Sequence, residues 1–183
     1  LPKAYQISQF DLPICNNGYV TIYTNGVEKK IRILRIHIEE DAGKLLHEGT
    51  LGSKVDYNRC GVPLIEIVTE PDLRSADEAK DFLDTIKSTM EYIDVSDCKM
   101  QEGSLRCDVN VSVRPKGSDK LGTRCEMKNV NSFSSAYKSI VYEAKRQIEL
   151  IEDGEQVIQQ TRRWDFTTTL QTNKSKIMIC NTM

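Results

Sequence analysis

The stretch that decides the fold is GSLRCDVNVSVRP, residues 103–115, because apolar and polar side chains alternate strictly along it. Successive side chains of a β-strand point to opposite faces, so one face of this strand is predicted to be buried and the other to be polar. The predicted polar face carries Arg106, Asp108, Asn110, Ser112 and Arg114. Residues 122–130, GTRCEMKNV, return after a turn, and we expect the two strands to pair in antiparallel fashion.

Two amphipathic helices are predicted to accompany this sheet. Ser75 with Glu78 three residues later has the pattern of a capping box, and apolar residues follow at helical spacing over residues 74–93. A second helix is predicted over residues 132–153, with Gly154 at its end. Asn25-Gly26 predicts a tight hairpin turn between two further strands. The fold class is therefore α+β, with a mostly antiparallel sheet and two long amphipathic helices.

The composition excludes several functions. The chain has 183 residues, 39% of them hydrophobic and 28% charged, with a net charge of −2, so no overall basic field attracts nucleic acid. No apolar run reaches the roughly 18 residues that cross a membrane, and the first residues do not resemble a signal peptide. The start LPKAYQ, without Met, suggests a piece of a longer protein. The six cysteines form no CxxC pair, which favours reduced, cytosolic thiols over a zinc site.

An acidic residue interrupts the apolar stretch PLIEIVTEPD, residues 63–72. A carboxylate within a buried strand must be paired, protonated or bound to a cation. We interpret Glu66 as a candidate Mg²⁺ ligand, with a buried salt bridge to Arg35 or Arg59 as the alternative. Glu40 is the last residue of another predicted strand and shares the face of that strand's apolar residues. It is therefore a second candidate ligand.

The polar faces of the strands at 104–114 and 122–130 form a second candidate site. Two such strands can simply be a sheet that is wetted on one side. Guanidinium, carboxylate, amide and ammonium groups in close order, however, suit the handling of phosphate and metal. We predict a catalytic role for Arg106, Asp108, Glu126 and Lys128.

Several long segments in fixed order resemble one known family. They are LPKAYQISQFDLPI, RIHIEEDAGK, VDYNRCGVPLIEIVTEPD, EGSLRCDVNVSVRP, EMKNVNSF and QTRRWD. Together they resemble the GatB family of the glutamine-dependent Asp-tRNA/Glu-tRNA amidotransferases, over residues 1–165. The resemblance implies most of the central β-rich cradle domain of the GatB subunit. It ends at Trp164-Asp165, so residues 166–183 are expected to be a divergent, poorly ordered tail.

The resemblance implies an activity, cofactors and partners. Members of this family use ATP and Mg²⁺ to phosphorylate the side-chain carboxylate of glutamate on Glu-tRNA(Gln), or of aspartate on Asp-tRNA(Asn). Ammonia from a partner glutaminase subunit then displaces phosphate, and a small third subunit braces the pair. The tRNA is held mainly by domains that this sequence lacks, and the expected location is cytoplasmic, or an organelle if the source is eukaryotic. Matching positions make Glu40 and Glu66 metal ligands and place Lys3 near the ammonia path.

Two other interpretations remain open at this stage. Asp108 on one strand with Glu126 and Lys128 on the next has the D…ExK arrangement of Mg²⁺-dependent nucleases, which cleave phosphodiesters without ATP. That interpretation leaves Glu40 and Glu66 without a role. The chain could also be an inactive fragment that retains surfaces for the glutaminase and for the small third subunit but no complete site.

Overall fold

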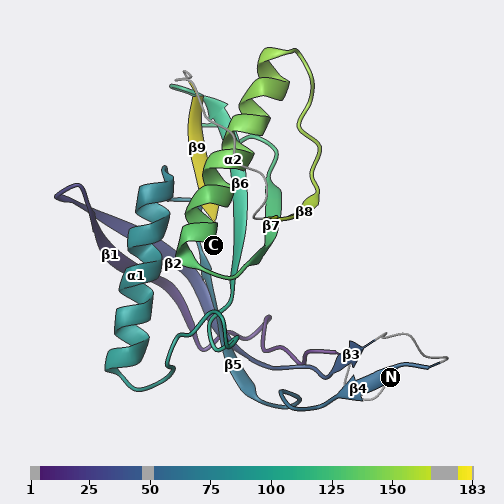
Figure 1. Ribbon diagram of the computed structural model, residues 1–183. Coiled ribbons are helices and arrows are strands. Elements are labelled where there is room, and N and C mark those ends of the chain that lie inside the picture. The colour runs from purple at the N-terminus through teal and green to yellow at the C-terminus, as the bar shows by residue number, and fades with distance from the viewer. Residues whose placement is uncertain (1–4, 47–51, 166–176, 183) are drawn as a thin grey trace. The chain divides into compact units, whose positions relative to one another are not determined.

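The structure, a computed structural model, describes residues 5–46 and 52–165, together with the backbone of residues 177–182 (Figure 1). Lys3 therefore lies outside the described residues, as does most of the predicted tail. The elements in chain order are β1 (Cys15–Thr24), β2 (Val27–Glu40), β3 (Lys44–Leu46), β4 (Lys54–Asp56), β5 (Pro63–Thr69), α1 (Ala76–Tyr92), β6 (Cys107–Pro115), β7 (Cys125–Val130), α2 (Phe133–Glu152), β8 (Thr161–Arg163) and β9 (Ile177–Thr182).

The chain forms two compact units that are each discontinuous in sequence. One consists of Leu1–Gly18 with Ile33–Val68, and the other of Tyr19–Arg32 with Thr69–Met183. Three sheets are present in the described residues, with strand orders β1-β2-β5, β3-β4 and β8-β7-β6-β9. The predicted α+β class with mostly antiparallel pairing is confirmed, since the pairs β3–β4, β6–β7 and β6–β9 are antiparallel and the pair β7–β8 is parallel. The predicted domain boundary at residue 165 stays a prediction.

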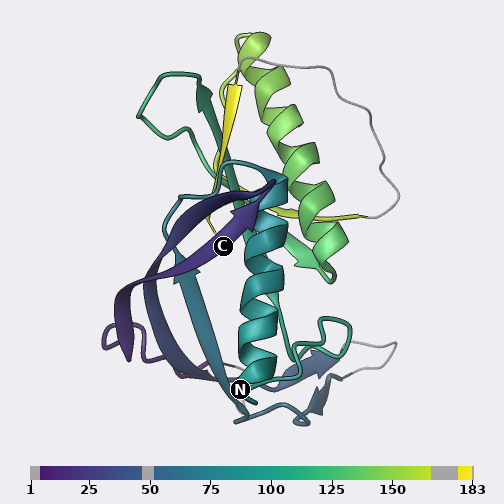
Figure 2. The ribbon, with the colours of Figure 1, turned by 90° about the vertical axis from the view of Figure 1, so that its left-hand side faces the viewer.

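The hairpin of β1 and β2 turns where the sequence predicted. Asn25 and Gly26 both have positive φ, 53° and 78°, as a type I′ turn requires. The turn end of the hairpin contacts α1 (Figure 2), where the Thr24 hydroxyl donates to Asp81 at 2.6 Å. Lys29 Nζ donates to Glu78 at the same distance. These polar contacts hold the hairpin end against the first turns of the helix.

Both predicted helices are present with nearly the predicted bounds. The Ser75 hydroxyl accepts from the Glu78 backbone N–H at 3.1 Å, which is half of the predicted capping box. The Glu78 carboxylate accepts from the backbone N–H of Arg74 instead of that of Ser75. Ser132 caps α2 by accepting from the Ser135 N–H. Each cap satisfies backbone donors that the first turn leaves unpaired.

The core of the larger unit lies between α2 and the strands β6 and β7, and α2 lies over these strands in Figure 1. Val109, Val111 and Val113 are buried as predicted from the alternation. The buried side of α2 is not purely apolar, because Glu143 and Gln147 are fully buried whereas the apolar Ile151 is 39% exposed. Sequence periodicity does not detect a buried polar residue whose partners lie on other elements.

Glu143 and Gln147 tolerate burial because most of their polar atoms have partners close by, although Gln147 Oε1 has none among the described residues. Arg146 donates to both Glu143 carboxylate oxygens at 2.7 and 2.9 Å, and Gln147 Nε2 donates to the carboxylate at 2.9 Å. Nε of Arg162, on β8, lies 3.3 Å from Oε2 of Glu143. Gln147 Nε2 also donates to the Val111 carbonyl. The network therefore ties α2 to β6 and β8, and its hydrogen bonds offset the cost of burying a carboxylate.

Strands are present in two segments where the sequence pattern predicted none. Lys44–Leu46 pairs with Lys54–Asp56, in a part of the chain where the sequence pattern predicted no strand. Ile177–Thr182 forms β9, which pairs antiparallel with β6, whereas no strand was expected in residues 166–183. The apolar run at 177–180 has the β-propensity for an edge strand, and the open edge of β6 supplies the partner. The remaining tail residues lie outside the described part of the chain.

Candidate functional site

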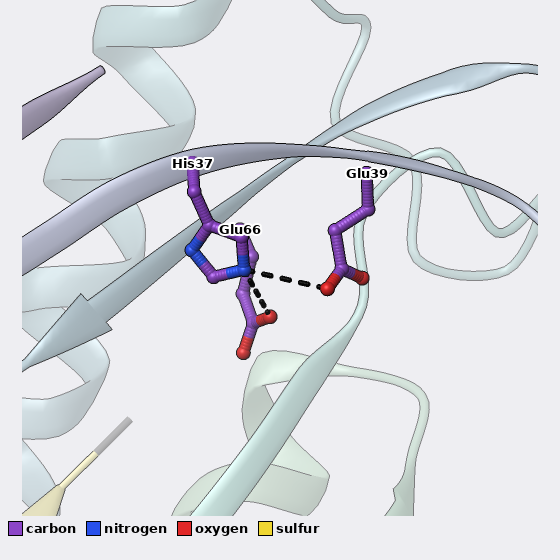
Figure 3. A group of neighbouring side chains, drawn as sticks. All are labelled: His37, Glu39 and Glu66. Atoms are coloured by element: carbon purple, nitrogen blue, oxygen red, sulfur yellow. Dashed lines mark hydrogen bonds and ion pairs between the residues drawn. The ribbon is translucent and has the colours of Figure 1, made fainter. Parts of the chain in front are cut away.

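A histidine and two glutamates converge in the smaller unit. His37 and Glu39 lie on one face of β2, and Glu66 reaches the same place from the neighbouring strand β5 (Figure 3). His37 Nε2 lies 3.3 Å from Glu39 Oε1 and 3.1 Å from Glu66 Oε2. One ligand atom from each residue lies within 4.8 Å of the others, which is close enough for all three to bind one ion. We call these three residues the histidine–carboxylate cluster.

His37 is the fully buried member of the cluster. The Phe10 ring meets the imidazole edge-on at 5.8 Å, and the Arg35 guanidinium lies 4.0 Å from the centre of the Phe10 ring. His37 Nδ1 has no hydrogen-bond partner among the described residues. The imidazole is therefore held by packing and presents its Nε2 atom to the two carboxylates.

The expectation that Glu66 is buried is wrong. Its side chain is 48% exposed, and the β5 residue before it, Ile65, is 45% exposed. The alternative of a buried salt bridge to arginine is also wrong, because Glu66 pairs with His37 while Arg59 pairs with Asp41 at 3.7 Å. An apolar run shows that a strand forms, but it does not show how much of the strand other elements cover.

The structure brings Glu39 rather than Glu40 to the cluster. Alternation along β2 places Glu39 on the face of His37 and Glu40 on the opposite face. Glu40 is not a member of the potential metal-binding groups found among the described residues. The role of Glu40 as a metal ligand stays a prediction from the family resemblance.

The donor set of the cluster fits a divalent cation. One imidazole nitrogen with two carboxylate oxygens is a common ligand set for Mn²⁺, Fe²⁺ or Zn²⁺, whereas Mg²⁺ prefers oxygen ligands and retains several waters. The exposed carboxylate of Glu66 leaves room for water and for a second oxygen ligand from a substrate. Nε2 faces two carboxylate acceptors, so without an ion it carries the ring proton, and it can serve as a ligand when that proton lies on Nδ1 instead. The residues present can therefore hold such an ion.

A lysine lies between two carboxylates on the polar face of β6 and β7. Lys128 Nζ is 2.5 Å from Asp108 Oδ2 and 3.0 Å from Glu126 Oε1. The second oxygen of Glu126 accepts from the Thr161 hydroxyl of β8 at 2.8 Å. Lys128 and Asp108 are both about half exposed, so a ligand in solution can reach them. We call Asp108, Glu126 and Lys128 the lysine triad.

The charges of the triad stabilise one another. Burial opposes the charged form of Lys128, but the hydrogen bonds to Asp108 and Glu126 outweigh it and raise the pKa of the ammonium group. For Glu126, burial likewise favours the neutral form, yet the bonds from Thr161 and Lys128 lower the pKa of the carboxyl group. Lys128 and Glu126 are therefore both charged at neutral pH, and the ammonium lies between two carboxyl groups.

A polar cavity of about 310 Å³ adjoins the triad at Glu126. Its lining consists of Asn110, Arg124, Glu126, Gln159, Gln160 and Thr161. Arg106 lies one residue before β6 and is exposed. The structure thus brings together three of the four predicted catalytic residues, Asp108, Glu126 and Lys128, and their catalytic roles stay predictions.

Sequence reasoning missed two features of these sites. His37 was interpreted as an ordinary strand residue, although its shared parity with Glu39 was a usable signal. Thr161 lies 35 residues beyond Glu126 on a three-residue strand, and no sequence pattern indicated that contact.

The five cysteines whose side chains are described are all free thiols. Within the described ranges, no helix has the length and apolar character needed to cross a membrane.

The fold defines an α+β protein, and comparison with known proteins identifies its family. The chain belongs to the GatB/GatE catalytic domain family, whose model matches residues 1–178. It is similar to proteins named as the GatB subunit of aspartyl/glutamyl-tRNA(Asn/Gln) amidotransferase. Identity is 68% over 166 residues for the protein of Caldicellulosiruptor saccharolyticus and 65% over 165 residues for that of Thermoanaerobacter sp. (strain X514).

The similarity covers most of this chain but only about a third of the length of each relative. For Carboxydothermus hydrogenoformans the identity is 57% over 169 residues. In all three comparisons the match covers 90% of this chain and 35% of the relative. The chain therefore spans about a third of the length of the curated relatives that it matches.

Proposed function

We propose that this chain is the catalytic part of the GatB subunit of a tRNA amidotransferase. In this proposal it phosphorylates the side-chain carboxylate of glutamate or aspartate esterified to tRNA, and ammonia converts the acyl phosphate to the amide. The observation that carries the proposal is the lysine triad on an exposed polar sheet, in a chain 68% identical to a protein named for this amidotransferase.

The phosphoryl transfer is a substitution at phosphorus. A carboxylate oxygen of the aminoacyl side chain attacks the γ-phosphorus of ATP, the bond to the bridging oxygen breaks, and ADP leaves. Negative charge spreads over the three equatorial oxygens and needs fixed cations. Lys128 suits this role because Asp108 and Glu126 hold its ammonium group before the substrate arrives. Arg106, exposed just before β6, supplies the second cation in this proposal.

The second half of the reaction releases phosphate. The ammonia nitrogen attacks the acyl carbon, the acyl–oxygen bond to phosphate breaks, and the nitrogen loses a proton to give the neutral amide. In the proposal the Glu126 carboxylate, which borders the polar cavity, lies near this proton. Its lowered pKa keeps it ionised and therefore able to accept a hydrogen bond from the incoming nitrogen.

A divalent cation and ATP are the cofactors of the proposed reaction. His37, Glu39 and Glu66 would hold the ion, whereas the family resemblance implies Glu40 in place of Glu39. When bound, the ion supplies positive charge that offsets the charge of phosphate oxygens. Mg²⁺ is the expected ion for ATP chemistry, although the imidazole ligand also favours Mn²⁺.

The proposal includes partners and a location. A glutaminase partner would supply ammonia, with Lys3 near the path, and a small third partner would brace the complex. Mischarged Glu-tRNA(Gln) or Asp-tRNA(Asn) would be bound mainly by parts of the relatives that this chain does not match. The bacterial relatives support a cytoplasmic complex.

The test compares two activities in one complex of the complete GatB protein with its glutaminase and small partners. In that complex, Arg106→Ala and Lys128→Ala are each expected to lower ammonia-dependent amidation of Glu-tRNA by about a hundredfold or more. Release of glutamate from glutamine should continue, because that reaction belongs to the glutaminase. Lys116→Ala, in the exposed turn after β6, is the matched control and should leave both activities intact. Full ammonia-dependent amidation in both site variants would overturn the proposal.

The same assays, with this chain in place of the complete GatB protein, distinguish the alternative functions. A D…ExK nuclease would cleave a phosphodiester substrate with a divalent ion and no ATP, and Lys128→Ala would abolish the cleavage. An inactive fragment would bind its partners but would accelerate neither ammonia-dependent amidation nor phosphodiester cleavage. The nuclease interpretation gives no role to the histidine–carboxylate cluster, which argues against it.

A further inference from the structure

The strand that carries Glu126 and Lys128 contains one extra residue. On the pair β6–β7, Val109 lies opposite Met127, but Cys107 lies opposite Val130. Two steps along β6 are thus matched by three along β7, and the register shifts by one. Asn129 is the residue with unusual backbone conformation at this point, with φ of +65°. This is a β-bulge with its left-handed residue at Asn129.

The bulge resolves a conflict in the side-chain pattern of β7. Met127 and Val130 are both buried, at 1% and 6% exposure, yet they are three residues apart, an odd spacing. In a regular strand, residues at odd spacing point to opposite faces, so burying Val130 would turn Met127 outward and Lys128 inward. The extra residue allows both apolar side chains to face the core while Lys128 stays on the exposed face.

Asn129 also joins the bulge to the end of β8. Its Nδ2 donates to the Trp164 carbonyl at 3.0 Å, and the Trp164 N–H donates to the Lys128 carbonyl at 2.8 Å. Trp164 is itself buried and packs edge-on against Tyr142 of α2, with ring centres 6.0 Å apart. These two hydrogen bonds join the backbone of Trp164 to Lys128 and Asn129. The peptide between Lys128 and Asn129 is therefore anchored to a buried residue.

The same anchor sets the position of Thr161. The strand β8 runs parallel to β7, with Thr161 beside Glu126 and Arg163 beside Lys128. Trp164 follows directly, so its bonds to Lys128 and Asn129 fix this register at its end. The register in turn allows the Thr161 hydroxyl to reach Glu126 at 2.8 Å.

We propose that Asn129 is a positioning residue for the amidotransferase reaction, since its left-handed conformation and its bond to Trp164 hold Lys128 on the exposed face between Asp108 and Glu126. The inference rests on the proposed function for its catalytic meaning. It concerns the geometry of Lys128 independently of that function. Asparagine suits the position because it tolerates the left-handed region better than other residues that carry a side-chain donor.

The test measures the reactivity of Lys128 in the complete GatB protein. A neutral acylating reagent modifies the uncharged amine, and the uncharged fraction at a given pH rises tenfold for each unit by which the lysine pKa falls, so the labelling rate rises as well. Mass spectrometry gives the rate at Lys128 relative to Lys116 in the exposed turn after β6. Asn129→Ala is expected to raise this ratio by about threefold or more, because alanine disfavours positive φ and Lys128 loses its carboxylate contacts.

Two variants separate positioning from general loosening. Asn129→Gly accepts positive φ but loses the Nδ2 donor to Trp164, so it should reverse most of the rise in the labelling ratio seen in Asn129→Ala, which makes it the rescue variant. Asp94 has a φ of 58° beyond the end of α1, so Asp94→Ala imposes a comparable backbone strain elsewhere. It should lower thermal stability without changing the ratio. An unchanged ratio in Asn129→Ala, or an equal rise in Asp94→Ala, would overturn the inference.

An activity measurement separates this inference from the proposed function. Asn129→Ala in the three-protein amidotransferase complex should lower ammonia-dependent amidation, and Asn129→Gly should largely restore it. If the labelling ratio rises as expected while amidation is unchanged, Asn129 positions Lys128 but Lys128 is not catalytic. That result would contradict the proposed function and leave the positioning role intact.

Discussion

The buried imidazole of His37 meets the exposed carboxylate of Glu66, with Nε2 and Oε2 3.1 Å apart on neighbouring strands β2 and β5. Glu39 joins them from two residues further along β2. A fixed nitrogen donor beside two carboxylates, one accessible to solvent, is the arrangement on which the metal assignment depends.

The first prediction separates Glu39 from Glu40 as metal ligands. Glu39→Gln is expected to raise the Kd for Mn²⁺ by at least about tenfold, since it replaces an anionic ligand by a neutral one, and Glu66→Gln should act similarly. Glu40→Gln should change the Kd little, because its side chain lies on the opposite face of β2. Titration of free Mn²⁺ by electron paramagnetic resonance gives each Kd. A large effect of Glu40→Gln without one of Glu39→Gln would instead support the assignment from the family resemblance.

The second prediction concerns the buried carboxylate of Glu143. Burial opposes its charge, but the hydrogen bonds from Arg146 and Gln147 lower its pKa below the ordinary value. Glu143→Gln should therefore cost about 3 kcal/mol of unfolding free energy at pH 7, because Arg146 and Arg162 lose their charged partner. Lys145→Gln on the same helix is the control, because its contact to Glu149 is partly exposed and should cost little.

The pH dependence of that difference follows from the direction of the shift. A depressed folded pKa means that the stabilisation is present above the ordinary glutamate pKa and is lost as the pH falls through the folded value. The difference between wild type and Glu143→Gln should be constant near neutral pH and shrink in acid, when measured by urea unfolding. A difference that grows on acidification would contradict this account.

The third prediction tests the close approach of Gly122 to β6. A Cβ at Gly122 would overlap the Val113 backbone carbonyl oxygen, and the backbone cannot rotate away as a side chain would. Gly122→Ala is therefore expected to destabilise the fold by about 2 kcal/mol or more. At Gly52 an added Cβ meets nothing within 4 Å, so Gly52→Ala should be nearly neutral. Equal thermal midpoints for the two variants would refute the prediction.

The fourth prediction concerns thiol reactivity. Burial raises the pKa of the Cys107 thiol to about 12, whereas Cys15 is exposed. At pH 8 only about one Cys107 thiol in ten thousand is ionised, so iodoacetamide should modify Cys15 well before Cys107. Peptide mass spectrometry measures both rates, with protein unfolded in urea as the reference in which they converge. Rapid modification of Cys107 in the folded protein would show that β6 is not buried as described.

Much of the fold follows from local pattern. The alternation along 103–115 identified β6 and its buried valines, Asn25-Gly26 identified the hairpin turn, and Ser75 marked the start of α1. These features depend on backbone sterics and on the two periods of side-chain direction, which a short window of sequence contains. The long motifs also pointed to the family, which the comparisons confirm.

The tertiary structure alone decided which polar side chains meet. Sequence parity did not select Glu39 over Glu40 as the partner of Glu66, because that choice depends on which faces of β2 and β5 lie together. Asn129 gives no sign in the sequence that it is an extra residue, since a bulge exists only relative to a partner strand. The reason is that hydrogen bonds and ion pairs act over about 3 Å, between groups that only the packing of distant segments brings together.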